Sequence, residues 1–212
     1  MIIAIDGPAG AGKSTIARSL ARRLGVIYID SGAMYRAVAL WALRAGIALD
    51  DMHKLEQLAC VAHIRFQGDR VFLNGEDVTA EIREPEISAA ASKVSIVPGV
   101  RKALRGEQRR IGAESGVVME GRDIGTVVFP DAQVKIYLDA DPEVRAERRA
   151  GETGSDPHLV AREMAERDDR DRSRREAPLT QAPDAEYIDS SRLTPEQVEE
   201  AILKIIRRRT SN

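Results

Sequence analysis

The chain alternates short apolar runs with longer segments in which apolar residues recur at helical spacing. The apolar runs have the length of β-strands and lie at residues 2–6, 26–30, 116–119, 134–138 and 186–189. After the first run, Ile16, Leu20 and Leu24 fall on one face of a helix that Gly25 is expected to end. Strands that alternate with helices favour an α/β fold with a parallel sheet covered by helices.

A different pattern interrupts this alternation after residue 63. Residues 64–67, 71–73 and 76–79 are short strand-like stretches, and Asn74-Gly75 between the last two is a strong hairpin signal. These stretches predict a small antiparallel meander, which is followed by helical patterns around residues 84–95 and 99–112. We therefore expect an insertion between the second and third strands of the parallel sheet.

A glycine-rich segment with the pattern GxxxxGKS joins the first strand to the first helix. Its glycines allow backbone N–H groups to turn inward around a polyphosphate, and the helix N-terminus that follows attracts anions. We interpret it as a phosphate-binding loop in which Lys13 meets the β and γ phosphates and Ser14 holds Mg²⁺. A glycine-rich turn that matches by chance is disfavoured, because strand, loop and helix occur in the required order. The expected ATP contacts are Gly7, Pro8, Ala9, Gly10, Ala11, Gly12, Lys13, Ser14 and Thr15.

Polar residues follow two of the predicted strands at the edge where ligands bind in open α/β sheets. Ser31, Tyr35 and Arg36 lie in the first turns of the helix after the second strand, although Ser31 is equally suited to cap that helix. The charged segment 120–123 follows the third strand. It either pairs internally or faces a cleft, and we favour the cleft.

The segment 145–175 is polar and rich in arginine. Residues 151–155 are expected to be a flexible break before a helix in which Arg167, Asp171 and Arg174 share one face. Taken alone, this face favours a solvated helix with weak surface ion pairs over an anion-binding surface.

Composition narrows the class of protein. The net charge of −2 predicts no general affinity for nucleic acid or anionic lipid, although the 32 basic residues comprise 26 arginines and 6 lysines. Cys60 is the single cysteine, the three histidines lack metal-ligand spacing, and no run reaches the roughly 18 apolar residues of a membrane span. We expect a cytoplasmic protein with no nucleic-acid or membrane partner.

Five segments in order resemble the bacterial cytidylate kinases, a family of P-loop nucleoside monophosphate kinases. They are DGPAGAGKST at 6–15, DSGAMYR at 30–36, LNGEDVT at 73–79, EGRDIGTVVFPDA at 120–132 and RDDRDRSRREAPL at 167–179. The resemblance covers nearly the whole chain. It implies transfer of the γ-phosphoryl group of ATP to CMP or dCMP, with Mg²⁺ bound to ATP, by an enzyme that we expect to be a monomer.

The resemblance also implies a domain organisation and a set of site residues. The chain would be a single P-loop kinase domain over 1–212, with a five-stranded parallel core, an inserted antiparallel meander and an arginine-rich lid. Its parts would be a core at about 1–30, 112–148 and 176–212, a monophosphate-binding lobe at about 31–111 and a lid at about 149–175. The implied contacts to CMP are Ser31, Tyr35, Arg36, Ser92, Arg101, Arg122, Asp123, Arg167, Asp171 and Arg174. The implied catalytic residues are Lys13, Arg122, Arg167 and Arg174.

Three alternatives stay open on the sequence. A P-loop kinase for another acceptor, such as UMP, dTMP or shikimate, fits the same loop. A switch GTPase predicts NKxD and DxxG motifs, and the sequence contains neither. A nucleic-acid-binding protein that uses segment 145–175 is disfavoured, because Asp168, Asp169 and Asp171 would repel a phosphate backbone.

Overall fold

The structure, a computed structural model, describes residues 1–210 and contains two compact units. One unit comprises Met1–Tyr28 and the chain from Ser115 onwards, and the other is Ile29–Glu114. The smaller unit is thus an insertion in the sequence of the larger one. Each unit has a hydrophobic core of its own.

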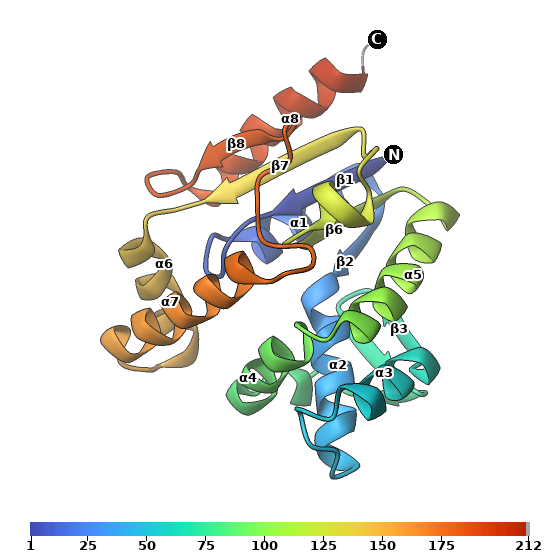
Figure 1. Cartoon of the computed structure of the whole chain (residues 1–212). Helices are drawn as coiled ribbons and strands as arrows, with labels where there is room; N and C mark the ends of the chain where they lie inside the picture. Colours follow the sequence, from blue (N-terminus) through green and yellow to red (C-terminus); the bar gives the residue numbers. More distant parts are fainter. Residues whose placement is uncertain (211–212) are drawn as a thin grey trace. The chain divides into compact units, whose positions relative to one another are not determined.

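The larger unit is built on a five-stranded sheet with the order β2-β6-β1-β7-β8 (Figure 1). Its strands are β1 (Ile2–Asp6), β2 (Ile27–Asp30), β6 (Val117–Gly121), β7 (Val134–Asp139) and β8 (Glu186–Asp189). The central strand β1 is parallel to both neighbours, and Ile5 lies beside Glu120 on one side and Ile136 on the other. The predicted five-stranded parallel α/β fold is confirmed.

Four α-helices and one π-helical turn complete this unit. They are α1 (Lys13–Leu24), η2 (Ile124–Val128), α6 (Pro142–Thr153), α7 (Pro157–Ser173) and α8 (Pro195–Thr210). Helices α1 and α8 pack against each other and against the sheet, where Leu20 and Ile202 are fully buried. Helices α6 and α7 pack together as a helical hairpin (Figure 1).

The smaller unit combines helices with the predicted meander. Its elements are α2 (Ser31–Arg44), α3 (Met52–Val61), β3 (Ile64–Gln67), β4 (Arg70–Leu73), β5 (Glu76–Asp77), η1 (Glu81–Arg83), α4 (Pro85–Val94) and α5 (Pro98–Glu114). The three strands are antiparallel neighbours in the order β3-β4-β5, which confirms the meander. Helix α2 packs on α4, and α3 packs on α5, around the buried side chains of Met34, Leu55 and Leu104.

The structure differs from one alternative, that Ser31 caps its helix, and from one prediction, that residues 151–155 are flexible. Helix α2 begins at Ser31 itself, and Asp30 is the cap, because its carboxylate accepts the backbone N–H of Ala33 at 3.1 Å. Residues 151–153, expected to be flexible, form the last turn of α6, which ends at Gly154 with a φ of 66°. At the start of α8, the side-chain oxygens of Thr194 and Gln197 each accept the backbone N–H of the other residue. No helix within residues 1–210 is both long enough and apolar enough to cross a membrane.

The absence of a side chain at Gly7 allows the chain to pass close to β7 after it leaves β1. Its φ is 149°, and a Cβ atom built on it would lie 1.9 Å from the carbonyl oxygen of Leu138. A side chain at this position would therefore push the loop off the strand.

We predict that Gly7→Ala lowers the free energy of unfolding by at least about 2 kcal/mol, because it adds a backbone clash to an unfavourable φ. Gly154→Ala is the matched control, since Gly154 also has a positive φ of 66° but open space around its Cβ position. It should cost only about 1 kcal/mol. Urea unfolding measures both variants, and equal losses would contradict the steric role of Gly7.

Candidate functional site

Residues 7–14 comprise the loop between β1 and α1 together with the first two residues of α1, and they are called the phosphate loop below. Gly10 and Gly12 adopt φ values of 73° and 90°, which residues with a Cβ rarely adopt. Gly10 also has no room for a side chain, since its Cβ would lie 2.7 Å from the carbonyl oxygen of Arg145. Gly12 is the N-cap residue of α1, so the N–H groups of the first helical turn open directly onto the loop. The glycine spacing is thus required by this backbone path.

Lys13 is buried at the start of α1, and its Nζ donates a hydrogen bond to the carbonyl oxygen of Pro8 at 2.6 Å. The pKa of Lys13 is lowered to about 7: burial lowers it most, the charges of Arg122 and Arg167 also lower it, and the charge of Glu120 partly opposes them. Three cationic side chains therefore act on one another near the phosphate loop. This arrangement favours the binding of an anion, because a negative charge would relieve the repulsion among the three side chains.

Asp171 on α7 holds two of the predicted arginines. Its carboxylate lies 2.9 Å from Nε of Arg122 and 3.6 Å from Nη1 of Arg174. Burial opposes ionisation of Asp171, but the charges of Arg122, Arg174 and Arg167 outweigh it and lower the pKa of the carboxyl. The side chains of Asp171 and Arg174 are only 7% and 5% exposed, so the interpretation of this face as a solvated helix was wrong.

The charged segment after the third predicted strand has internal partners. Strand β6 continues through Glu120 and Gly121, and Glu120 accepts a hydrogen bond of 2.6 Å from the hydroxyl of Tyr28. Arg122 pairs with Asp171, and Asp123 is 7% exposed. Glu120 and Arg122 therefore have internal partners within the larger unit. That this segment also faces a cleft stays a prediction. The sequence did not reveal the partners, because they lie 92 and 49 residues away along the chain.

Asp6 at the end of β1 is a buried acidic residue that sequence reasoning missed. Its two carboxylate oxygens accept the backbone N–H groups of Ile124 at 2.8 Å and Gly125 at 2.7 Å. These bonds anchor the turn η2, which directly follows Arg122 and Asp123 in the sequence. Burial raises the pKa of Asp6 to about 6, although the two backbone hydrogen bonds lower it.

The predicted acceptor residues Ser31, Tyr35 and Arg36 lie together on the first turns of α2 in the smaller unit. Arg36 donates a 2.6 Å hydrogen bond to Asp30, the carboxylate that also caps the helix. Ser31 is 5% exposed. One aspartate thus fixes both the start of α2 and the position of the arginine.

Ser92 on α4 and Arg101 on α5 belong to the same unit and are 6% and 3% exposed. Arg101 donates to the carbonyl oxygen of Ser95 at 3.1 Å, and its guanidinium lies 5.6 Å from the ring centre of Tyr35. The Oγ atom of Ser92 is buried and has no hydrogen-bond partner in the described part of the chain. Buried hydroxyls without partners are rare, and a polar ligand is one explanation for such a group.

A parallel sheet with this phosphate loop and a helix that holds arginines through carboxylates defines a P-loop kinase fold. Two solved structures share the fold at low sequence identity: a gluconokinase from Sinorhizobium meliloti 1021 and an uncharacterized protein from Eubacterium ventriosum. The first has a TM-score of 0.50 at 17% identity and covers 99% of this chain and 93% of its own. The second has a TM-score of 0.53 at 14% identity, with coverages of 97% and 98%.

The chain belongs to the cytidylate kinase family, whose family model matches residues 3–208. It is 60% identical to the cytidylate kinase of Solibacter usitatus over 100% of this chain and 94% of that relative. It is 53% identical to the cytidylate kinase of Pelotomaculum thermopropionicum, with coverages of 95% and 93%. The resemblance found in the sequence is confirmed.

We predict that Asp6 makes the protein less stable as pH rises from 4 to 7.5. Its pKa is raised from 3.8 to about 6 in the folded state, so its favourable contribution is complete below pH 3.8 and is lost as pH rises through about 6. Asp6→Asn does not titrate and is the reference. The unfolding free energy of wild type minus that of Asp6→Asn should fall by up to about 3 kcal/mol over this range. Urea unfolding at several pH values tests this, and a constant difference would contradict it.

Proposed function

We propose that this chain transfers the γ-phosphoryl group of ATP to CMP and dCMP and releases ADP with CDP or dCDP. Membership of the cytidylate kinase family supports the reaction. The observation that carries the assignment of the site is the burial of Lys13 at the start of α1, where its Nζ donates to the carbonyl oxygen of Pro8 within the phosphate loop. The nearby charges of Arg122 and Arg167, which lower the pKa of Lys13, agree with it. A buried group of cations beside a phosphate loop is suited to the triphosphate of ATP and to the phosphoryl group in transfer.

In this proposal, the backbone N–H groups of the phosphate loop and the side chain of Lys13 bind the triphosphate. Lys13 would leave the carbonyl oxygen of Pro8, to which it donates now, and meet the β and γ phosphates. Ser14 is exposed at the first turn of α1 and offers its hydroxyl to Mg²⁺. A single hydroxyl from the protein would be enough to hold the ion, because Mg²⁺ sites in nucleotide-binding proteins commonly draw most of their ligands from phosphate and water. When bound, the ion neutralises charge that develops on the phosphates.

The reaction needs no general base from the protein. The nucleophile is a phosphate oxygen of CMP, and the second pKa of such monoesters is about 6, so it is already ionised at neutral pH. The task that remains is to position two anions and to balance their charge. Arg122, Arg167 and Arg174 are suited to this task because planar guanidinium groups bind phosphate oxygens in pairs.

We assign recognition of the acceptor to the residues that the family resemblance implies. Ser31, Tyr35 and Arg36 would contact its phosphate and ribose, while Ser92, Arg101 and Asp123 would contact the cytosine. Asp171 would reach the ribose once a ligand competes for its arginine partners. The unpartnered hydroxyl of Ser92 supports the base assignment, because a buried polar group discriminates strongly between ligands that do and do not bond to it.

We further propose that residues 149–175 act as a lid over a single kinase domain, which works as a monomer. A lid that closes over bound nucleotides excludes water, which could otherwise accept the γ-phosphoryl group and hydrolyse ATP. The hairpin of α6 and α7 carries Arg167 and Arg174, so its closure would also deliver two of the assigned cations.

We predict that CMP and dCMP are the best acceptors in a panel with UMP, dTMP and shikimate, each assayed with Mg²⁺ and ATP at equal concentration. The measurement is kcat/KM from steady-state release of ADP. Ser92→Ala should reduce the preference for CMP over UMP by about tenfold, since it removes one hydrogen bond to the base. Ser88→Ala, on the same helix, is the control and should leave the preference unchanged. Faster turnover of UMP by the wild type would overturn the assigned specificity.

We predict that binding of ATP at pH 8 takes up a proton at Lys13. The pKa of Lys13 is about 7 without nucleotide, so the amine is mostly neutral at pH 8, and the charges of the triphosphate would raise that pKa. Titration calorimetry in buffers of different ionisation enthalpy measures the uptake. Lys13→Met should abolish it and lower kcat by at least about a hundredfold. Lys204→Met, at an exposed position on α8, is the control. Equal proton uptake in both variants would refute the role of Lys13.

A further inference from the structure

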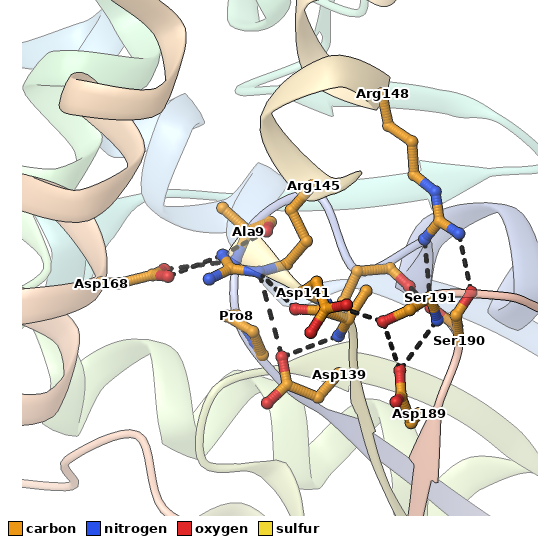
Figure 2. Close-up of polar contacts among 12 residues, drawn as sticks. Pro8, Ala9, Asp139, Asp141, Arg145, Arg148, Asp168, Asp189, Ser190 and Ser191 are labelled. Atoms are coloured by element: carbon orange, nitrogen blue, oxygen red, sulfur yellow. Dashed lines mark hydrogen bonds and ion pairs between the residues drawn. The ribbon is translucent and has the colours of Figure 1, made fainter. Parts of the chain in front are cut away.

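Arg145 on α6 is an arginine that lies outside the residues assigned above, yet its side chain is only 6% exposed. Its Nε donates to the carbonyl oxygen of Ala140 at 3.0 Å, and its Nη1 donates to the carbonyl oxygen of Ala9 at 3.0 Å. The same Nη1 donates to Asp168 on α7 at 2.6 Å. Arg145 therefore connects the phosphate loop, the end of β7 and α7 (Figure 2).

Asp168 contacts the phosphate loop directly as well. Its Oδ1 lies 3.5 Å from the backbone nitrogen of Ala9, while its Oδ2 accepts from Arg145. Ala9 is thus held at its N–H by Asp168 and at its carbonyl oxygen by Arg145 (Figure 2). Two side chains from α6 and α7 grip one residue of the phosphate loop.

Apolar packing and a second contact reinforce this junction. Ala9 packs on a buried cluster that includes Ala150 and Met164 from the helical hairpin. Arg148, one turn after Arg145 on α6, donates to the carbonyl oxygen of Ser190 at 2.7 Å, and the hydroxyl of Ser190 donates to the carbonyl oxygen of Ala11 at 3.2 Å. The loop is consequently held at two points by the hairpin and the segment after β8.

The position of Asp168 along α7 relates this junction to the site. It directly follows Arg167, and one turn later Asp171 holds Arg122 and Arg174. Because a helix is rigid over one or two turns, fixing Asp168 fixes where Arg167 and Asp171 project, and Asp171 in turn holds its two arginine partners. A contact that ties Asp168 to the phosphate loop therefore sets the distance between the loop and the arginines.

We propose that Arg145 and Asp168 are a pair of positioning residues that couples the phosphate loop to the arginines of α7. The charged groups of the two residues are engaged with each other and with Ala9, so the role assigned to them is positioning and not chemistry. Through this pair, binding of phosphate groups in the phosphate loop is coupled to the placement of Arg167 and Arg174. This inference rests on the proposed binding of ATP at the phosphate loop.

The first test compares Asp168→Asn with Asp169→Asn, which removes an exposed carboxylate from the next position of the same helix. Asp168→Asn should lower kcat at saturating ATP and CMP by about ten- to a hundredfold, the usual effect of misplaced catalytic groups. Its Kd for a non-hydrolysable ATP analogue should change less than about threefold, since the loop keeps its glycines and its contact to Ser190. Asp169→Asn should match the wild type. A kcat for Asp168→Asn within twofold of that for Asp169→Asn would overturn the proposal.

The second test is a readout that a purely structural ion pair would not change. Hydrogen exchange of the peptide that covers α7 is measured with and without the ATP analogue and Mg²⁺. Binding should protect α7 in the wild type and in Asp169→Asn but not in Asp168→Asn. Persistent protection in Asp168→Asn would overturn the coupling, even if its thermal stability fell.

The third test uses Arg145→Lys, which keeps the positive charge but loses the planar guanidinium that donates to several acceptors at once. Its control is Arg162→Lys, at an exposed position of α7. Arg145→Lys and the double variant with Asp168→Asn should show the same loss of kcat, since residues that act as one unit are not additive. Additive losses would contradict a shared role.

If Asp168→Asn does not fold, Arg145→Lys is used for both the kinetic and the exchange test. If the wild type binds the analogue but phosphorylates no CMP, the proposed function fails while the exchange test still decides the coupling.

Discussion

Burial of like charges is the constraint on which the site depends. Lys13, Arg122 and Arg167 act on one another in a region where ionised side chains are costly to bury, and burial lowers the pKa of Lys13 to about 7. Carboxylates on neighbouring elements make the cluster tolerable, since Glu120 supports the charge of Lys13 and Asp171 lies between Arg122 and Arg174. The fold thus keeps these cations close together despite their mutual repulsion, an arrangement suited to binding an anion.

The carboxylates also hold neighbouring parts of the chain in place. Asp6 anchors the turn behind Arg122, Asp30 both caps α2 and holds Arg36, and Asp171 holds two arginines at once. Most of them follow or end a strand of the parallel sheet, where several chain segments meet. Asp30 and Asp171 fix arginine side chains that are otherwise long and flexible, so less conformational entropy remains to be lost when phosphate binds.

This arrangement suits a reaction that needs charge balance more than proton transfer. In the proposed reaction the phosphate nucleophile is already ionised, so the protein would contribute oriented cations and no general base. The unpartnered Ser92 hydroxyl and the buried Arg101 beside Tyr35 add a polar surface in the smaller unit that is suited to the edge of a base. Phosphate chemistry and base recognition are thereby assigned to separate elements of the chain.

Local pattern alone was sufficient for much of this protein. The alternation of strands and helices predicted the five-stranded parallel sheet, Asn74-Gly75 predicted the meander, and the glycine spacing of the phosphate loop predicted its backbone path, because each depends on residues close in sequence. What the sequence could not specify were contacts between distant residues. Whether Ser31 or Asp30 capped α2, whether α7 was solvated, and which carboxylate held Arg122 or Arg145 all had reasonable alternatives. Tertiary structure decided them, because the energy of a charged side chain is set by the partners and the burial that folding brings to it, and its own position in the sequence specifies neither.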